Sequence, residues 1–259
     1  MTQRHATSSI CTYNTKQIFV RGEDLCESLI GGVSLGDFIY LIVLGTRPTA
    51  AQRAIVEAAI VALADHGIAP SVVAARITYM GAPESLQGAV AAGLLGVGDQ
   101  FVGTVELTAP LLVEMVSHPD GLEAAARAIV QRHGEQKKLL PGFGQPHHKP
   151  DDPRPAALFK VAEAHGVSGR YVAALKALSR AFDESLGRHM TINAPGAIAA
   201  LFLEIGVPLK IMRGFLVISR CIGLVGHLHE EQNKPAGRAM WEAAAHAVEY
   251  DGKAPPASA

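Results

Sequence analysis

Residues 139–154 read Leu-Leu-Pro-Gly-Phe-Gly-Gln-Pro-His-His-Lys-Pro-Asp-Asp-Pro-Arg. The prolines and glycines in its first half exclude a long helix here and predict an irregular loop. His147 and His148 stand side by side in this loop, and Pro153 favours the start of a helix that carries Arg154 in its first turn. Histidine titrates near neutral pH and arginine offers a fork to carboxylates, so the stretch suits an acid/base site for an anion. A surface turn with solvated histidines is the alternative, because isolated short motifs often mislead.

The composition predicts a globular protein with a sizeable core. The chain has 259 residues, of which 49% are hydrophobic, enough for one large domain or two modest ones. Its net charge of −1 argues against general nucleic-acid binding, which needs a basic field. The three cysteines are scattered and suggest neither a disulfide framework nor a CxxC metal site. The polar N-terminus lacks a signal pattern, and no uninterrupted apolar run reaches membrane-spanning length. We therefore expect a soluble, cytoplasmic protein that does not bind membranes.

Away from the loop, apolar residues recur at helical spacing and strand signals are few, which predicts an all-α fold. Ser34 precedes an apolar helix that Gly45 ends, and only residues 18–22 read as a short extended piece. Residues 85–98 are rich in Ala, Gly and Leu and predict a buried core helix, and Pro110 predicts the start of another helix. Further helices are expected near 155–165, 168–187, 194–205, 208–226 and 238–249. The chain has no Walker, GxGxxG, HExxH or GxSxG motif, which removes the common nucleotide, zinc-protease and serine-hydrolase functions.

Several blocks of the sequence resemble the citrate synthase superfamily in the correct order. Gly142-Phe143-Gly144, followed at spacing by Lys149 and by Asp152-Pro153-Arg154, resembles the signature loop of that family. Asp65-His66-Gly67 with Ser71 and Arg76 looks like its first histidine segment, and 85–103 is similar to small citryl-CoA lyases and to the lyase module of ATP-citrate lyase. Later blocks that resemble the family are Ser219-Arg220-Cys221-Ile222-Gly223 with His227 and Glu230, and Gly237-Arg238 with Trp241. The resemblance covers roughly 7–250, and the short chain favours the citryl-CoA lyase branch.

The resemblance implies an architecture and an activity. It implies a citrate synthase-like large domain from 1–108 and 190–259, with an inserted small helical domain at 109–189. It implies a homodimer, or a higher homo-oligomer, whose sites are completed across the interface. The implied reaction makes or breaks a carbon–carbon bond between an acyl-CoA enolate and a carbonyl acid, as a lyase or acyltransferase. The expected small-molecule partners are acyl-CoA and di- or tricarboxylates. Coenzyme A enters as a thioester substrate or product, with no tightly bound cofactor and no metal.

The resemblance also assigns binding residues. The family positions that bind the polycarboxylate correspond in this chain to His66, Arg154, Arg220 and Arg238. We assign coenzyme A binding to four residues of the signature loop, Gly142, Phe143, Gly144 and Lys149. Arg220 falls in an apolar helix, where an unpaired charge would cost several kcal/mol, so an anionic partner is expected. Plainer interpretations remain: His66 could cap a helix, Arg154 could pair with a neighbouring aspartate, and Arg238 could be solvated. His227, His229 and Glu230 could suggest a metal, but i, i+2 positions do not share a helix face, which favours packing and polar contacts.

Two positions depart from the family pattern. The family has an acid/base histidine directly after Gly-Phe-Gly, where this chain has Gln145. The family has an Asn-Val-Asp block whose aspartate handles the α-proton of the thioester, where this chain has Asn193-Ala194-Pro195. An amide is no general acid near neutral pH, and proline offers no titratable group.

Three hypotheses follow from these departures. In the first, the chain is an enzyme with diverged chemistry on an acidic acyl-CoA thioester. His147, or else His148, then takes over proton transfer, and Gln145 orients the substrate carbonyl. In the second, the chain is a catalytically inactive homologue that binds coenzyme A or a carboxylate and has a regulatory role. In the third, the arginines form structural ion pairs and both histidines are solvated.

Overall fold

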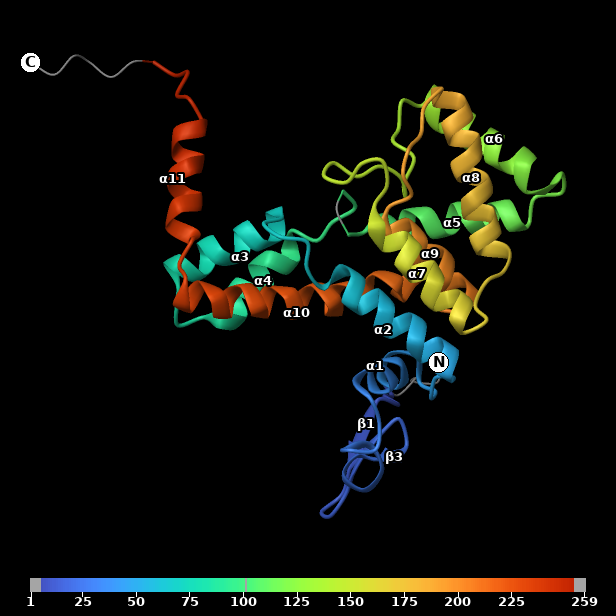
Figure 1. The fold of residues 1–259 in the computed structure, drawn as a ribbon. Helices are drawn as coiled ribbons and strands as arrows, with labels where there is room; N and C mark the ends of the chain where they lie inside the picture. The colour runs from blue at the N-terminus through green and yellow to red at the C-terminus, as the bar shows by residue number, and fades with distance from the viewer. Residues whose placement is uncertain (1–5, 101, 254–259) are drawn as a thin grey trace, which may run out of the picture. The chain divides into compact units, whose positions relative to one another are not determined.

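The computed structural model describes residues 6–100 and 102–253. Within them the protein is helical apart from one small sheet, so the predicted all-α fold is confirmed (Figure 1). The chain divides into two compact units: unit 1 comprises Met1–Leu63 and Asp99–Ser219, and unit 2 comprises Ala64–Gly98 and Arg220–Ala259. The separate small domain expected at 109–189 stays a prediction; in this division the helices of that range belong to unit 1.

Unit 1 begins with a three-stranded antiparallel sheet in the order β1-β2-β3. Its strands are β1 (Cys11–Tyr13), β2 (Ile18–Val20) and β3 (Glu23–Asp24), with Cys11 opposite Val20 and Phe19 opposite Asp24. A single π-helical turn, η1 (Leu25–Leu29), follows, because the Asp24 carboxylate accepts the backbone N–H groups of Cys26 and Glu27. The extended piece expected at 18–22 is confirmed for Ile18–Val20, whereas Arg21 and Gly22 form a turn with positive φ.

The next two helices start at side-chain caps that the sequence announces. At the start of α1 (Leu35–Leu44), Ser34 and Asp37 cap each other's backbone N–H, and Gly45 ends the helix in the left-handed region at φ 85°. At the start of α2 (Ala50–Ala64), Thr49 and Gln52 exchange the same pair of hydrogen bonds. These helix boundaries agree with the prediction because capping is a local property of the sequence.

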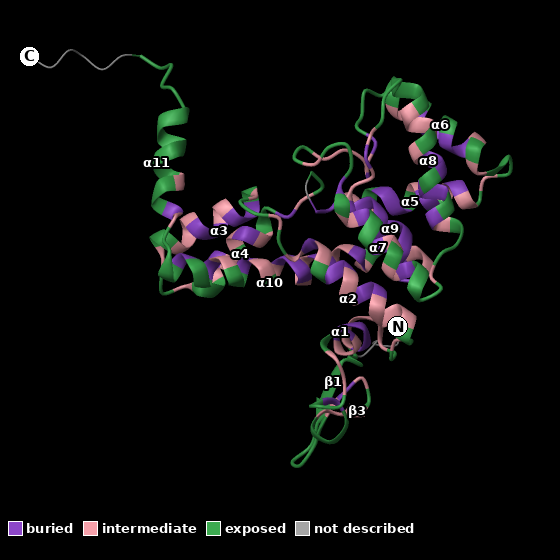
Figure 2. Ribbon diagram, in the orientation of Figure 1, coloured by how far each residue is buried: buried purple, intermediate pink, exposed green. Residues whose placement is uncertain are grey.

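The main body of unit 1 surrounds one helix. α9 (Ala194–Glu204) is buried over its first nine residues, and three other helices contact it (Figure 2). Those three are α5 (Thr104–Val116), α7 (Pro153–Ala164) and α8 (Arg170–Leu186). α6 (Gly121–Glu135) packs on α5 and α8, and η2 (Leu209–Ile211) contacts α5. The loop 139–152 lies between α6 and α7. Its glycine turn is hydrogen-bonded to the residues that lead into α9.

Pro110 does not start a helix, so that prediction was wrong. α5 begins at Thr104 and carries Pro110 in its interior. A proline inside a helix removes one N–H and frees the carbonyl four residues earlier. Pro110 is exposed, and the opposite face of α5 is held by the buried Val105, Ala109 and Leu112. Burial of that apolar face outweighs the lost hydrogen bond.

Unit 2 is a smaller helical cluster. It contains α3 (Pro70–Gly81), α4 (Leu86–Leu95), α11 (Gly237–Ala247) and residues 220–233 of α10 (Met212–Asn233). α3 contacts both α4 and α11, and the core consists of Val72, Ala75, Ala89, Leu224 and Leu228. At Gly93, an added Cβ would lie 2.7 Å from a Leu224 methyl and 2.8 Å from a backbone oxygen. The small residues of α4 therefore permit the close packing that the sequence predicted.

One expectation for these helices was wrong. α4 is not a fully buried core helix, because Leu86 is exposed and Leu95 is 88% exposed. The segment Leu209–Asn233 is long and apolar enough to cross a membrane by length and composition, although charged residues such as Arg213 and Arg220 interrupt its apolar run. Core helices of water-soluble proteins pass the same test, and Phe215 in unit 1 and Leu224 in unit 2 are fully buried against protein. Sequence shows how apolar a helix is and leaves open what covers it.

Candidate active site

The Gly142-Phe143-Gly144 turn is held in unit 1 by backbone hydrogen bonds. Gly144 N–H donates to the Thr191 carbonyl at 2.8 Å, and Asn193 N–H donates to the Gly142 carbonyl at 3.0 Å. Phe143 and Ile192 form the antiparallel bridge between them. These bonds do not depend on side-chain identity, so the turn keeps its path whichever residue follows it.

Two glycines let this turn approach the start of α9. Gly142 has φ +89°, a region that favours glycine, and an added Cβ there would lie 2.8 Å from the Thr108 hydroxyl. A Cβ on Gly196 would lie only 2.5 Å from the Gly142 carbonyl oxygen. The two backbones are thus in direct contact, and neither position has room for a side chain.

Asn193 ties the turn to the helix a second time. Its side-chain oxygen accepts the Gly196 N–H at 3.0 Å as the N-cap of α9, and its amide nitrogen donates to the carbonyls of Phe143 and Gly144. Pro195 is buried in the first turn of the helix. The position that the resemblance assigns to a proton-abstracting aspartate is thus, in this chain, a buried helix-starting proline with no titratable group.

The side chain of Gln145 is used within its own loop. Its Oε1 accepts the backbone N–H of His147 at 2.7 Å, and its backbone carbonyl accepts from Lys149 Nζ at 2.9 Å. The amide NH₂ of Gln145 is the part of this side chain that can donate to a substrate carbonyl. His147 is exposed and His148 is half-buried in the same loop. The loop therefore gathers the residues assigned to proton transfer and to coenzyme A.

Arg154 pairs with the N-cap of its own helix. The buried Asp152 carboxylate accepts from Arg154 Nε at 2.9 Å and from Nη2 at 2.7 Å, and the Asp152 N–H donates to the Thr191 hydroxyl. Burial acts to raise the pKa of Asp152, but the hydrogen bonds from Arg154 outweigh it and hold that pKa below its usual range. The local pairing considered for Arg154 is therefore present, and a ligand would share this guanidinium with Asp152.

A histidine that the sequence analysis did not single out joins the loop to α8. His189 Nε2 lies 2.9 Å from Asp151 Oδ1, and Nδ1 lies 2.7 Å from Asp183 Oδ2. An ionised carboxylate can accept hydrogen bonds but cannot donate them. When the imidazole is protonated, both of its ring nitrogens therefore donate, one to each aspartate. The hydrogen bonds to Asp151 and then Asp183 raise the pKa of His189. This three-residue clamp, His189 with Asp151 and Asp183, fixes the loop just before Asp152.

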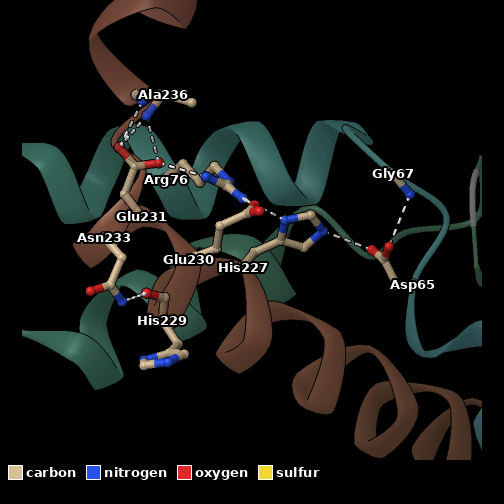
Figure 3. Close-up of polar contacts among 10 residues, drawn as sticks. Asp65, Gly67, Arg76, His227, His229, Glu230, Glu231, Asn233 and Ala236 are labelled. Atoms are coloured by element: carbon tan, nitrogen blue, oxygen red, sulfur yellow. Dashed lines mark hydrogen bonds and ion pairs between the residues drawn. The ribbon is translucent and has the colours of Figure 1, made fainter.

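Unit 2 contains a connected network of charged side chains (Figure 3). Arg76 is 1% exposed and donates to Glu231 at 2.8 Å, to Glu230, and to His227 Nδ1 at 2.9 Å. Glu231 also accepts the N–H groups at the start of α11. Burial acts to raise the pKa of Glu231, but these backbone bonds and Arg76 hold it below its usual range. The buried guanidinium is thus fully compensated by two carboxylates.

The network ends at the turn that carries His66. His227 Nε2 lies 2.8 Å from Asp65 Oδ1, and Asp65 Oδ2 accepts the Gly67 N–H at 3.1 Å. The buried Arg220 places Nη1 3.9 Å from the same Asp65 oxygen. Arg220 and the half-buried His66 are therefore grouped around Asp65 within unit 2. Arg238 instead lies on the exposed face of α11 and pairs with Glu242 at 2.9 Å.

The polar contacts expected for His227 and Glu230 are confirmed, but Arg76 and Asp65, named only as parts of the first histidine segment, were not predicted as their partners. A buried arginine must have counter-charges, and the Glu230-Glu231 pair was the signal of where they lie. Asp183 and His189 were missed because nothing local marks a partner far along the chain. Across the described ranges 6–100 and 102–253, no group of three or more histidine, cysteine or acidic side chains is arranged to hold a metal.

Comparison with solved structures supports the overall fold. A citryl-CoA lyase structure from Hydrogenobacter thermophilus is 32% identical, with a TM-score of 0.86 over 99% of this chain and 98% of that one. An ATP citrate lyase structure from Methanothrix soehngenii, in complex with citrate and coenzyme A, shares the fold at 20% identity. Its TM-score is 0.81, over 98% of this chain and 43% of that one.

The sequence matches the same group of proteins. The family described as citrate synthase, C-terminal domain, matches residues 34–240, and the chain belongs to it. Among curated proteins, ATP-citrate synthase beta chain protein 1 of Oryza sativa subsp. japonica is 25% identical over 249 residues. That alignment spans 86% of this chain and 40% of the relative, so the chain covers less than half the length of the curated relatives it matches.

Proposed function

We propose that the protein is a carbon–carbon lyase that acts on an acidic acyl-CoA thioester of the citryl-CoA type, with diverged acid/base chemistry. The observation that carries the proposal is the end-to-end match to a citryl-CoA lyase at 32% identity. The backbone hydrogen bonds that hold the Gly142–Gly144 turn support it, since they do not depend on the identity of residue 145. Cleavage would run from the thioester to acetyl-CoA and a keto acid, and the same site could run the reverse acyl transfer.

The proposed roles follow from what each side chain can do. As the carbon–carbon bond breaks, the substrate hydroxyl must lose a proton and the thioester enolate must gain one. We assign this exchange to His147, with His148 as the second candidate, because Gln145 and Pro195 supply no titratable group. The Gln145 NH₂ would donate to the substrate carbonyl.

The remaining assigned residues bind the substrate. His66, Arg154, Arg220 and Arg238 would bind the carboxylates, since arginine matches carboxylate geometry. Gly142, Phe143, Gly144 and Lys149 would contact the coenzyme A part. No tightly bound cofactor and no metal enter this scheme.

A histidine series on citryl-CoA tests the proposal. Turnover is followed by mass spectrometry of acetyl-CoA release for the wild type and for His147→Ala, His148→Ala and Gln145→Ala. We expect His147→Ala to lower turnover at least about tenfold, roughly 1.4 kcal/mol of barrier. Lys160→Ala, at an exposed position on α7, is the matched control and should leave turnover unchanged. Unaltered turnover in both histidine variants would reject the displaced-histidine mechanism.

The second candidate function is a catalytically inactive homologue that binds coenzyme A or a carboxylate and has a regulatory role. One hydrogen bond favours this function: the side-chain Oε1 of Gln145 accepts the backbone N–H of His147, so this oxygen stabilises the loop. A wild type that binds citrate and coenzyme A in calorimetry without cleaving citryl-CoA would support it. Cleavage that appears only in Gln145→His would show that this position diverted the chemistry.

We also propose a cytoplasmic homodimer, or higher homo-oligomer. Apolar side chains on unit 2, including Leu95, Ile222 and Val225, are exposed in the single chain. Large exposed apolar surfaces mark interaction sites. Sedimentation at micromolar concentration should give a dimer or a larger oligomer, and a monodisperse monomer with intact ligand binding would contradict this proposal.

A further inference from the structure

Both oxygens of the Asp65 carboxylate are held by groups other than Arg220. Oδ1 lies 2.8 Å from His227 Nε2, and Oδ2 lies 3.1 Å from the Gly67 N–H, whereas Arg220 Nη1 is 3.9 Å from Oδ1. Close arginine–carboxylate bonds are about 2.7–2.9 Å long. The ion pair between the buried Arg220 and Asp65 is therefore longer than a hydrogen bond.

Hydrogen-bond chemistry fixes the tautomer of His227. A guanidinium has only donors, so Arg76 Nη2, at 2.9 Å, must donate to His227 Nδ1, which carries a lone pair. The ring proton then sits on Nε2 and points to Asp65 at 2.8 Å (Figure 3). His227 acts here as a neutral donor whose direction is set by Arg76.

The other end of this chain of bonds is rigid. Arg76 is buried, and Glu231 holds its guanidinium at 2.8 Å while accepting from the N–H groups of Ala236 and Gly237. Glu230 pairs with the same guanidinium. The charged groups that face His227 are thus Asp65 on one side and Arg76 with its two glutamates on the other. His227 has a fixed acceptor on one nitrogen and a fixed donor on the other.

We propose that His227 is a positioning residue that holds the Asp65 carboxylate away from Arg220, so that the guanidinium can receive a carboxylate of the ligand. This inference rests on the proposed function, which assigns a ligand carboxylate to Arg220. Without the Nε2–H donor, the Asp65 carboxylate turns toward the nearby guanidinium and forms the shorter ion pair. An incoming anion must then displace an internal carboxylate, which lowers its affinity.

Two substitutions at position 227 separate the roles of its nitrogens. His227→Gln places an amide NH₂ near the Nε2 position and keeps the donor to Asp65. His227→Asn is too short to reach Asp65 but keeps a polar group facing Arg76. We expect His227→Asn to bind citrate at least about tenfold more weakly in calorimetry, and His227→Gln to stay within about threefold of the wild type. Crystal structures should show the Asp65–Arg220 distance closing from 3.9 Å to hydrogen-bond length only in the asparagine variant.

The second arm repeats the asparagine substitution in an Asp65→Asn background. The uncharged amide competes far less for Arg220, so the tenfold effect of His227→Asn should fall below about threefold there. A merely structural role of His227 would give the same loss in both backgrounds and overturns the inference. A distance that stays near 3.9 Å in His227→Asn overturns it as well.

The proposed function and this inference fail in different ways. If the wild type binds neither citrate nor citryl-CoA, the ligand role of Arg220 is wrong, and the proposed function falls with it. The crystallographic distance in His227→Asn still reports whether His227 holds Asp65 back. Nitrogen-15 NMR of His227 adds an independent readout: a proton found on Nδ1 contradicts the assigned tautomer.

Discussion

The two groups of candidate site residues are built in opposite ways. In unit 1 the Gly142–Gly144 turn is fixed by backbone hydrogen bonds and by two glycines in contact, and its side chains contribute little to its shape. In unit 2 the surroundings of Arg220 are fixed by side chains, through Asp65, His227 and Arg76. A backbone-built site tolerates exchange of its chemical groups, whereas a site built from buried charges loses its geometry when one charge is removed.

This difference accounts for which features the chain retains. By the resemblance, Gln145 and Pro195 stand where the family pattern has its acid and base, and in this chain the turn and the α9 cap are held by backbone and side-chain hydrogen bonds. In unit 2 the buried charges have charged partners of their own. Substitutions in the two regions should therefore affect stability and binding by very different amounts.

The largest effect is expected from breaking the buried ion pair of unit 2. Arg76→Ala leaves Glu231 buried with its charge uncompensated by arginine, which should lower the free energy of unfolding by about 3–5 kcal/mol. Urea denaturation measures it. Arg132→Ala, which breaks the exposed pair with Glu114, is the matched control, with an expected loss of at most about 1 kcal/mol. Equal losses in the two variants would contradict the view that buried charges hold unit 2.

The second effect tests the backbone-built turn. Gly142→Ala adds a methyl 2.8 Å from the Thr108 hydroxyl at φ +89°, and the combined strain and overpacking should cost about 2–4 kcal/mol. Gly187→Ala is the control: it shares a positive φ of +62° but has open space around the new methyl, so only about 1–2 kcal/mol is expected. Thermal unfolding ranks the pair, and a reversed order would show that close packing of the turn matters little.

The third effect concerns ligand binding at Arg220. Arg220→Ala should weaken citrate binding by about 1.5–3 kcal/mol, because a charge-assisted hydrogen bond is lost. Arg220→Lys should also weaken it, since a point charge does not reproduce the bidentate fork. Calorimetry with citrate measures the affinity of both variants. The loss of affinity in Arg238→Ala, at the exposed pair with Glu242, is then compared with the loss in Arg220→Ala. Unchanged affinity in Arg220→Ala would reject this assignment.

The smallest effect is a pH dependence from the His189 clamp. Its pKa is raised by hydrogen bonds to Asp151 and then Asp183, so its stabilisation is full below about pH 6.5 and is lost as pH rises through the folded-state pKa. The pKa of Asp151 is lowered by the same bond, so its share is present above about pH 3.9 and is lost as pH falls through its lowered folded-state pKa. The side chain of His189 is 47% exposed, which limits the effect to below about 1 kcal/mol.

The test is the difference in unfolding free energy between the wild type and His189→Gln, measured by urea denaturation from pH 4 to pH 9. The difference should be largest at about pH 4–6.5 and shrink toward pH 8–9. His165→Gln, at an exposed histidine at the end of α7, provides the reference curve. A difference that stays constant with pH would show that the clamp is not a charge-dependent contact.

The parts of the fold that rest on local chemistry could be predicted from the sequence. The cap of α1 by Ser34, its end at Gly45 and the start of α7 at Pro153 follow from residues within one helical turn. The loop at 139–152 follows from its own prolines and glycines. Resemblance supplied the fold and the order of the blocks, which residue periodicity alone leaves open.

The rest depends on contacts between distant residues. Arg76 and His227 are 151 positions apart, and Asp151 meets His189 across 38 positions, so no local pattern marks either pair. Leu95 belongs to an apolar helix, but the sequence does not say which of its faces another surface covers. Pro110 looked like a helix start because the sequence does not show how far the apolar face of α5 is buried by other helices.

The contact between Gly142 and Gly196 has a consequence for how this chain can change. A methyl on either glycine meets the other's backbone, so the two positions constrain each other and neither is free to vary alone. Position 145 lies just beyond this constrained pair, in a loop whose path is already set. The identity of residue 145 is therefore separable from the architecture that presents it, and new reactivity can be sampled there without rebuilding the scaffold.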